Sequence, residues 1–176
     1  MERVTIGSWY ESTPFMRPSG RPGVSAVLEE RLLVGEYPTP EDAEWLRETH
    51  GVTAVVCLQD DADLASKNLD LRALARAYER AGIAFHHVPV ADGDVRDLAA
   101  RLPDILARLH ALVAAGERVY LHCNAGFNRA PTVAIAYVHH HRGLPLQDAW
   151  ELVKQRRSCA PYRRALELHF SEETSS

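Results

Sequence analysis

The chain has 176 residues, of which 46% are apolar and 25% are charged, and its formal net charge at pH 7 is −4. These values are ordinary for a globular protein with one sizeable domain, and the mildly acidic balance lacks the basic footprint of a nucleic-acid-binding protein. No apolar run approaches the ~20 residues that span a bilayer, and the N-terminus lacks the apolar centre of a signal peptide, so we expect no membrane partner. Three cysteines, an odd number, favour a reducing compartment, and we expect a cytoplasmic location.

The N-terminal third is predicted to begin with an irregular arm over residues 1–23, rich in Pro, Gly, Ser and Arg. Such an arm either packs on the domain or contributes its aromatic side chains, Trp9, Tyr10 and Phe15, to a substrate wall. A single domain is then expected over residues 24–170, before a disordered tail at 171–176. Its first expected elements are strands at 25–28 and 31–34, a helix over 39–50, a strand over 52–58 and a polar loop over 59–68.

The rest of the domain alternates helical and extended patterns. The expected elements are a helix over 69–81, a strand over 83–90, a helix over 97–115, a strand over 118–122, and helices over 130–141, 146–157 and 161–170. Pro103 should kink the helix over 97–115 unless that helix begins later. This alternation predicts an α/β fold, with a mostly parallel central sheet flanked by helices. Ligands bind at the carboxyl ends of strands in such sheets, and Cys57, Asp92 and Cys123 all lie at or just past strand ends. We therefore expect one shared site there.

The most informative segment is HCNAGFNRAPT at residues 122–132, directly after an apolar run. Cys123 and Arg129 stand six positions apart, with Gly126 between them permitting a tight backbone curl. Pro131 suits the first turn of the following helix. One short loop at this point can surround a tetrahedral oxyanion with backbone N–H groups and aim a thiolate at its central atom. The pattern predicts a cysteine-dependent phosphatase.

Each residue of this loop then has an expected role. Cys123 is the nucleophile, because loop amides, the helix N-terminus and a nearby arginine all favour the thiolate. Arg129 binds two phosphoryl oxygens through its planar guanidinium and balances charge in the transition state. His122 orients the loop through a ring hydrogen bond. The remaining phosphate-binding positions are Asn124, Ala125, Gly126, Phe127 and Asn128.

A leaving alkoxide also needs a proton from a separate general acid. Asp92 is our first choice and Asp94 is its rival, although Asp94 and Asp97 suit a helix cap better. No cofactor and no metal are expected, since the sequence contains no HExxH pattern. His139, His140 and His141 lie on successive faces of a helix and are expected to form a solvated stretch.

These residues resemble the protein tyrosine phosphatase superfamily, specifically its dual-specificity branch, and most closely the plant glucan phosphatases. The resemblance covers roughly residues 30–170 and rests on LLVGEYPTPEDAEWLRE, VVCLQDDADL, DGDVRDLAARLP, HCNAGFNRAP and KQRRSCAP. It implies a phosphomonoesterase acting through a phosphocysteine intermediate on phosphotyrosine, phosphoserine or phosphothreonine proteins, or on phosphoglucan. It also places the general acid at Asp92.

The chain departs from these relatives at several positions. Gly93 stands where the glucan enzymes carry an aromatic residue, Asn128 where glycine is usual, and Ala130 where many dual-specificity members have Ser or Thr. The resemblance also implies that Cys57 is either a reversible disulfide partner of Cys123 or a plain buried cysteine, whereas Cys159 is expected to be structural. Two other functions stay open at this point, a non-catalytic phosphate-binding module and an arsenate reductase.

Overall fold

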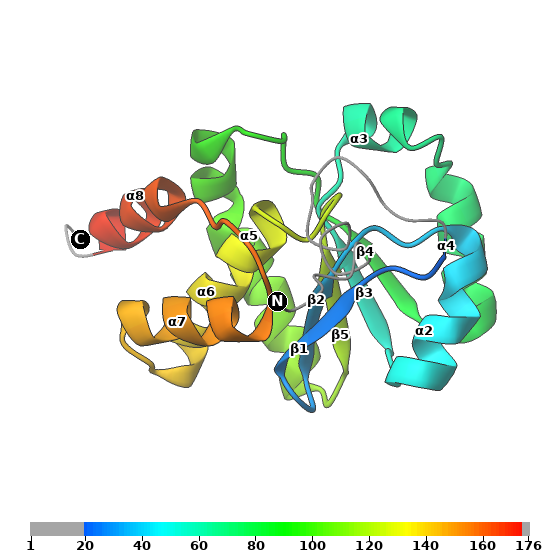
Figure 1. The fold of residues 1–176 in the computed structure, drawn as a ribbon, viewed down its shortest axis with the longest axis horizontal. Helices are drawn as coiled ribbons and strands as arrows, with labels where there is room; N and C mark the ends of the chain where they lie inside the picture. The colour runs from blue at the N-terminus through cyan, green and yellow to red at the C-terminus, as the bar shows by residue number, and fades with distance from the viewer. Residues whose placement is uncertain (1–19, 174–176) are drawn as a thin grey trace, which may run out of the picture.

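The computed structural model describes residues 20–173 and contains a five-stranded sheet with helices on both faces (Figure 1). The aromatic side chains expected in the arm, Trp9, Tyr10 and Phe15, lie outside the described residues. The strands are β1 (Val24–Leu28), β2 (Leu32–Gly35), β3 (Ala54–Cys57), β4 (Ala84–His87) and β5 (Val119–His122). Their order across the sheet is β1-β2-β5-β3-β4.

The helices connect these strands in chain order. They are the 3₁₀ helix η1 (Pro40–Asp42), α2 (Ala43–His50), α3 (Asp61–Ser66), α4 (Leu71–Ala81), α5 (Val95–Ala114), α6 (Arg129–Arg142), α7 (Leu146–Arg156) and α8 (Arg163–Glu173). The first pair of strands is antiparallel and the other pairs are parallel. The predicted α/β class with a mostly parallel sheet is therefore confirmed.

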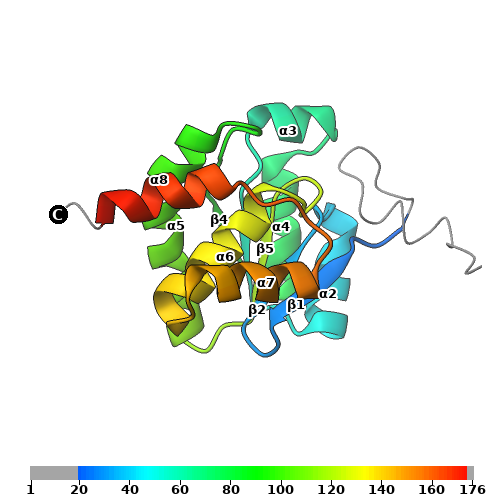
Figure 2. The ribbon, with the colours of Figure 1, turned by 60° about the vertical axis from the view of Figure 1, so that its left-hand side comes forward.

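Two apolar cores lie on the two faces of the sheet. Along β3 and β5, Val55 and Tyr120 enter the core under α2 and α4, whereas Val56 and Leu121 enter the core beneath α5 and α6. This alternation follows from the two-residue period of a strand. Figure 2 shows α5, α6, α7 and α8 gathered on the second face. The central strands are thus buried on both sides, which explains their continuous apolar sequence.

Several expected boundaries were wrong for local reasons. The predicted loop over 59–68 contains α3, because the Asp60 side chain caps that helix by accepting a hydrogen bond from Asp63 N. Asp94 caps α5, which therefore begins two residues earlier than expected and is continuous across Pro103. The final helix extends to Glu173, so the predicted disordered tail does not begin at 171.

The three consecutive histidines do not form a simple solvated stretch. His139 is half-buried, hydrogen-bonds the Leu144 carbonyl oxygen and packs edge-on against Phe170. His141 stacks on His110 with ring centroids 4.1 Å apart. These contacts come from α5 and α8, elements distant in sequence that fold against α6.

Candidate active site

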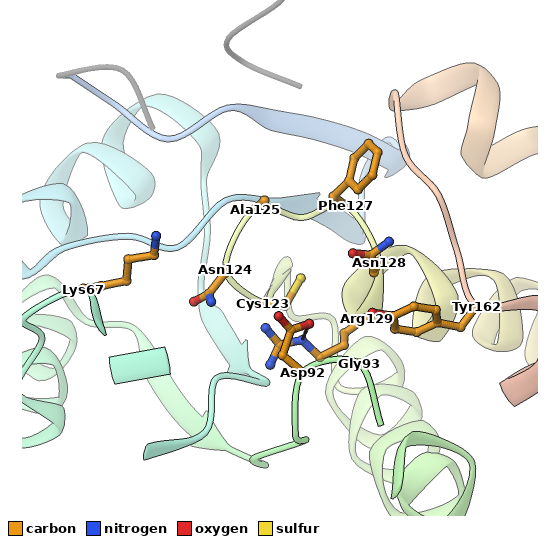
Figure 3. A pocket seen from close by; sticks show the side chains of 10 residues that line it. All are labelled: Lys67, Asp92, Gly93, Cys123, Asn124, Ala125, Phe127, Asn128, Arg129 and Tyr162. Atoms are coloured by element: carbon orange, nitrogen blue, oxygen red, sulfur yellow. Dashed lines mark ion pairs between the residues drawn. The ribbon is translucent and has the colours of Figure 1, made fainter. Parts of the chain in front are cut away.

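The loop over residues 123–128 leaves the end of β5 and leads into α6 (Figure 3). Gly126 has φ +60°, a conformation that favours glycine. A Cβ atom at this position would lie 2.5 Å from the carbonyl oxygen of Gly35, at the end of the neighbouring strand β2. The close approach of two backbones therefore requires a glycine here, and it fixes the curl that the sequence pattern indicated.

The carbonyl groups of this loop point outward, where other segments donate hydrogen bonds to them. Arg157 donates from Nε to Gly126 O at 2.7 Å and from Nη2 to Ala125 O at 3.0 Å. Tyr37 N donates to Asn124 O, and the backbone N–H of Ala160 donates to Phe127 O. In a trans peptide the N–H points opposite to the C=O. The four N–H groups that follow these carbonyls, at residues 125–128, therefore face the inside of the loop, where an oxyanion would bind.

Arg129 lies beside this concavity with its side chain only 2% exposed. Its Nη1 donates to Asp63 Oδ2 at 2.6 Å and to the carbonyl oxygen of Val90 at 2.8 Å. Its Nε is buried without a hydrogen-bond partner among residues 20–173 and lies 3.4 Å from Asp92 Oδ1. An unsatisfied buried donor is costly, so this nitrogen indicates a site built for an acceptor from outside the chain.

Asp63 holds this guanidinium in place. Burial alone would raise the pKa of Asp63, but hydrogen bonds from Arg129 and Asp60 and the charge of Arg129 outweigh that effect and hold the pKa below its usual range. In the reverse direction, burial tends to lower the pKa of Arg129, and the Asp63 carboxylate overcomes this and raises it. Arg129 is therefore a fixed cation.

A polar network extends this arrangement to the loop. The Asn124 side chain donates to Asp63 Oδ1 at 2.7 Å and accepts from Gln59 Nε2 at 2.7 Å. Gln59 is fully buried, and its carbonyl oxygen contacts His87 Nε2 at 2.6 Å. The ends of β3 and β4 are thus joined to the loop through hydrogen bonds, which hold the Asn124 side chain against the same carboxylate that binds Arg129.

The two acid-loop carboxylates differ in their surroundings. Asp92 is 59% exposed on its side chain and lines the pocket beside Arg129 and Gly93 (Figure 3). Asp94 instead accepts a hydrogen bond from Asp97 N at the start of α5. The Asp97 carboxylate in turn accepts one from Ala91 N. Asp92 is therefore the acid-loop carboxylate in the pocket, while Asp94 is used as a cap.

Cys123 lies at the floor of this pocket and is only 3% exposed. Its sulfur is drawn among the side chains of Arg129, Asp92 and Asn124 in Figure 3. The neighbouring His122 is buried, and its Nδ1–H donates to the carbonyl oxygen of Cys123 at 2.9 Å. That bond orients the backbone at Cys123.

Cys57 does not line the pocket. It is fully buried at the end of β3, beside His122 in the sheet register, and its thiol donates to Gln59 Oε1 at 3.7 Å. Burial raises the pKa of the Cys57 thiol to about 12. The thiol is therefore neutral at physiological pH. Cys159 is buried as well, in the apolar core between α7 and α8.

The pocket has a volume of about 380 Å³ and a rim of varied side chains. Lys67, Phe127, Asn128 and Tyr162 stand around the mouth, and the lining also includes Gly93 and Ala125. Burial, and then the charge of Asp92, raise the pKa of the Tyr162 phenol, which is consequently neutral. The pocket thus combines two cationic side chains, Lys67 and Arg129, with the Asp92 carboxylate and the aromatic rings of Phe127 and Tyr162.

Two further findings concern metal ligands and membrane-spanning helices. Within residues 20–173, His, Cys, Asp and Glu side chains form no group of three or more placed to hold a metal ion. No helix in the described part of the chain combines the length and apolarity needed to cross a bilayer.

Sequence reasoning missed the residues that support the loop from a distance. Asp63, Gln59 and Arg157 carry no local pattern that assigns them to the site, because each acts on a residue at least 31 positions away. The only available signal was their position inside the stretches VVCLQDDADL and KQRRSCAP, which carry the family resemblance.

Comparison with known proteins gives a consistent result. The family model for the dual specificity phosphatase catalytic domain matches residues 35–166. The phosphoglucan phosphatase DSP4, amyloplastic, from Castanea sativa is 37% identical over 134 residues, which cover 74% of this chain and 35% of that protein. The phosphoglucan phosphatase LSF1, chloroplastic, from Arabidopsis thaliana is 29% identical over 140 residues, which cover 79% and 24%.

Solved structures share the same fold. The crystal structure of human DUSP28 matches with a TM-score of 0.69 and 27% identity, covering 91% of this chain and 98% of that one. By contrast, the chain spans only 35% and 24% of the length of the two curated plant relatives. The substrates of those longer proteins are accordingly stated of those proteins alone.

Proposed function

The chain belongs to the family of dual specificity phosphatase catalytic domains, and on that premise we propose that it hydrolyses phosphomonoesters through a phosphocysteine intermediate without a metal ion. The observation that carries the proposal is the buried Arg129 Nε, which has no hydrogen-bond partner within residues 20–173 and lines the pocket with Cys123, beside a loop whose N–H groups turn inward. This arrangement supplies positive potential at the point where phosphoryl oxygens gain charge.

The first step forms the phosphocysteine. The Cys123 thiolate attacks phosphorus in line with the ester oxygen, the S–P bond forms and the P–O bond breaks. Asp92, protonated at this stage, gives its proton to the departing oxygen. Arg129 Nε and the loop amides bind the equatorial oxygens, while Asp63 keeps the guanidinium in its plane.

The second step regenerates the enzyme. Asp92, now a carboxylate, accepts a proton from water, whose oxygen attacks phosphorus. The S–P bond breaks, and its electron pair returns to Cys123 as the thiolate. Inorganic phosphate leaves, and the proton on Asp92 is again available for the next ester.

The proposed substrates are phosphotyrosine, phosphoserine or phosphothreonine in proteins, or phosphoglucan. Two phosphoglucan phosphatases among the relatives support the second class. Gly93 supports the first, because a glycine in the acid loop offers a sugar ring no surface for stacking. Comparing kcat/KM on a phosphotyrosine peptide, a phosphothreonine peptide and phosphorylated amylopectin decides between them.

We further propose a reducing compartment, the cytoplasm being our expectation. The support is three free, buried cysteines, one of which must stay reduced to act as a nucleophile. Location in cells by fluorescence microscopy of the full-length protein tests this point, because the two plant relatives have plastid locations in their names.

Turnover of para-nitrophenyl phosphate in the presence of a chelator tests the activity directly. We expect turnover between about pH 5 and about pH 8, its loss in Cys123→Ser, and its retention in Cys159→Ser, a matched change at a buried thiol outside the pocket. Phosphate binding with no turnover across this range would instead identify a non-catalytic phosphate-binding module.

A further inference from the structure

Lys67 brings a second positive charge to the pocket that the chemistry at phosphorus does not use. Its side chain lines the pocket, on the opposite side of the mouth from Tyr162 (Figure 3). It makes no ion pair with any residue between 20 and 173, whereas the Arg129 guanidinium is bonded to Asp63 and faces Asp92. The Lys67 ammonium is thus a half-buried cation available to a ligand.

The position of this ammonium is constrained. Lys67 is the C-cap of α3, and its backbone N–H donates to Asp63 O at 3.1 Å. Its Nζ lies 5.4 Å from the centre of the Tyr37 ring, within the range of a cation–π contact. Tyr37 is itself tied to the phosphate loop, since its N–H donates to Asn124 O. The same short helix therefore positions Arg129, through Asp63, and Lys67.

The pocket also has room for more than the reacting group. A phosphate group, with its ester oxygen, has five heavy atoms, and at about 30 Å³ each, the share of a water molecule in the liquid, it occupies at most about 150 Å³. The pocket volume is about 380 Å³. Lys67 is one of the residues that line this volume, so its ammonium can reach a group beyond the reacting phosphate.

We propose that Lys67, supported by the Tyr37 ring, forms a subsite for a second anionic group next to the phosphoamino acid of a peptide substrate. The anion is a carboxylate or a second phosphate, either of which an ammonium binds by a charge-assisted hydrogen bond. A peptide is favoured over a sugar for two reasons. Gly93 provides no surface in the acid loop on which a sugar ring could stack, whereas the Lys67 ammonium complements an anionic side chain of a peptide. This inference rests on the proposed phosphatase activity.

The experiment compares kcat/KM on phosphotyrosine peptides that differ at one neighbouring position, which carries Glu, Gln or a second phosphoserine. We expect the wild type to prefer the anionic peptides roughly three- to tenfold at low ionic strength, and the preference to shrink as salt screens the charges. The Glu and phosphoserine arms distinguish the two sources of the anion. Phosphorylated amylopectin is the fourth substrate.

The variants are chosen to isolate the charge. Lys67→Gln should abolish the preference and Lys67→Glu should reverse it, while Lys67→Arg, which keeps the charge, should restore it. Lys154→Gln removes a charge from an exposed position of α7, away from the pocket lining, and should keep the full preference. Thermal melting of each variant shows whether it is folded.

Each outcome decides the matter. If the wild type hydrolyses the peptides and Lys67→Gln retains the same preference, the subsite is wrong although the activity stands. A wild type that shows no preference, or that hydrolyses phosphorylated amylopectin faster than every peptide, also overturns the inference. Absence of any turnover, including that of para-nitrophenyl phosphate, rejects the proposed function itself, and the subsite with it.

Discussion

The pair formed by Arg129 and Asp63 is the most consequential contact at the scale of single residues. Both side chains are buried, and the Asp63 carboxylate also binds Asn124. A buried guanidinium left without its carboxylate is strongly destabilising, whereas the intact pair fixes the orientation of the arginine. The pair therefore contributes to the stability of the fold and to the geometry of the site.

Replacing Asp63 with asparagine tests this contribution. We expect Asp63→Asn to lower the free energy of unfolding near neutral pH by about 3–5 kcal/mol, because the Arg129 charge stays buried. Asp61→Asn, an exposed change on the same helix, should cost under about 1 kcal/mol. Urea unfolding of the three proteins measures both values. Equal stabilities of the two variants would contradict the expectation.

The same pair predicts a pH dependence of stability. The pKa of Asp63 in the fold is below its usual value, so its contribution is fully present above that usual value, about 4, and is lost as pH falls through the lower folded pKa. The difference in the free energy of unfolding between wild type and Asp63→Asn should therefore narrow only in this acid range. A gap that stays constant below about pH 4 would show that the carboxylate charge is not involved.

Asp92 and Asp94 are separated by one residue and have different expected effects. Asp92→Asn should lower kcat on esters with poor leaving groups by about 10²–10⁴-fold with little change in phosphate binding. Asp94→Ala should instead cost about 0.5–2 kcal/mol of stability through the lost cap and keep most of the activity. Steady-state kinetics and thermal melting distinguish the two, and the reverse pattern would assign the acid to Asp94.

Cys57 stays a proposed redox partner of Cys123. The rate at which the two form a disulfide should depend on how much of the Cys57 thiol is deprotonated. Because the pKa of the Cys57 thiol is about 12, its thiolate fraction at neutral pH is very small and rises about tenfold with each pH unit. After mild peroxide treatment, disulfide formation should accelerate between about pH 7 and about pH 9, and it should be absent in Cys57→Ser. Identical recovery of wild type and Cys57→Ser with a reductant would reject the pairing.

At the scale of elements, the phosphate loop depends on the strands and helices around it. The loop is curled against β2 by Gly126, supported from outside by Arg157 at the end of α7, and bonded to the segment between α7 and α8 through Ala160. Its shape is thus determined by contacts with segments far along the chain, not by its own sequence alone.

Two glycines with similar φ angles allow the cost of a strained backbone conformation to be measured apart from the cost of a steric clash. Gly126 and Gly143 both have positive φ, at +60° and +73°, but a Cβ at Gly143 meets nothing within 4 Å. Gly143→Ala should therefore cost about 1–2 kcal/mol with activity retained. Gly126→Ala should cost more and abolish turnover, because the added carbon must displace the backbone of Gly35. Equal melting temperatures and activities of the two variants would contradict this.

Elements that depend on local chemistry could be predicted from the sequence, and those that depend on distant partners could not. The strands around Val55 and Tyr120 were predictable because continuous apolar runs indicate burial on both faces. The helix α3 was missed, because its six residues include a run of acidic side chains that is typical of a loop. The ion pair between Asp63 and Arg129 joins residues far apart in the chain, so the local sequence does not indicate it. Burial of the histidines at the end of α6 depends likewise on His110 and Phe170, which are not their sequence neighbours.

At the scale of the whole molecule, the sheet brings the active groups together. Strands β3, β4 and β5 are parallel neighbours, so the segments that carry Gln59, Asp92 and Cys123 leave the sheet at one edge. The family resemblance implied the same fold, and the match over residues 35–166 confirms it. The proposal of Cys123 as nucleophile and Arg129 as its arginine came from their spacing, whereas the network beneath them needed the three-dimensional structure.

The formation of a covalent bond between phosphorus and Cys123 is the most direct consequence of this arrangement. The variant Asp92→Asn, given para-nitrophenyl phosphate, should accumulate the intermediate, because the nitrophenolate leaves without a proton while water is no longer activated. A burst of nitrophenolate should come first. Acid quenching and mass spectrometry of the peptides should then find a phosphoryl group on the Cys123 thiol. The double variant that also carries Cys123→Ser should show no such group. Hydrolysis with no phosphorylated cysteine, or a phosphoryl group on another residue, would contradict the proposed mechanism.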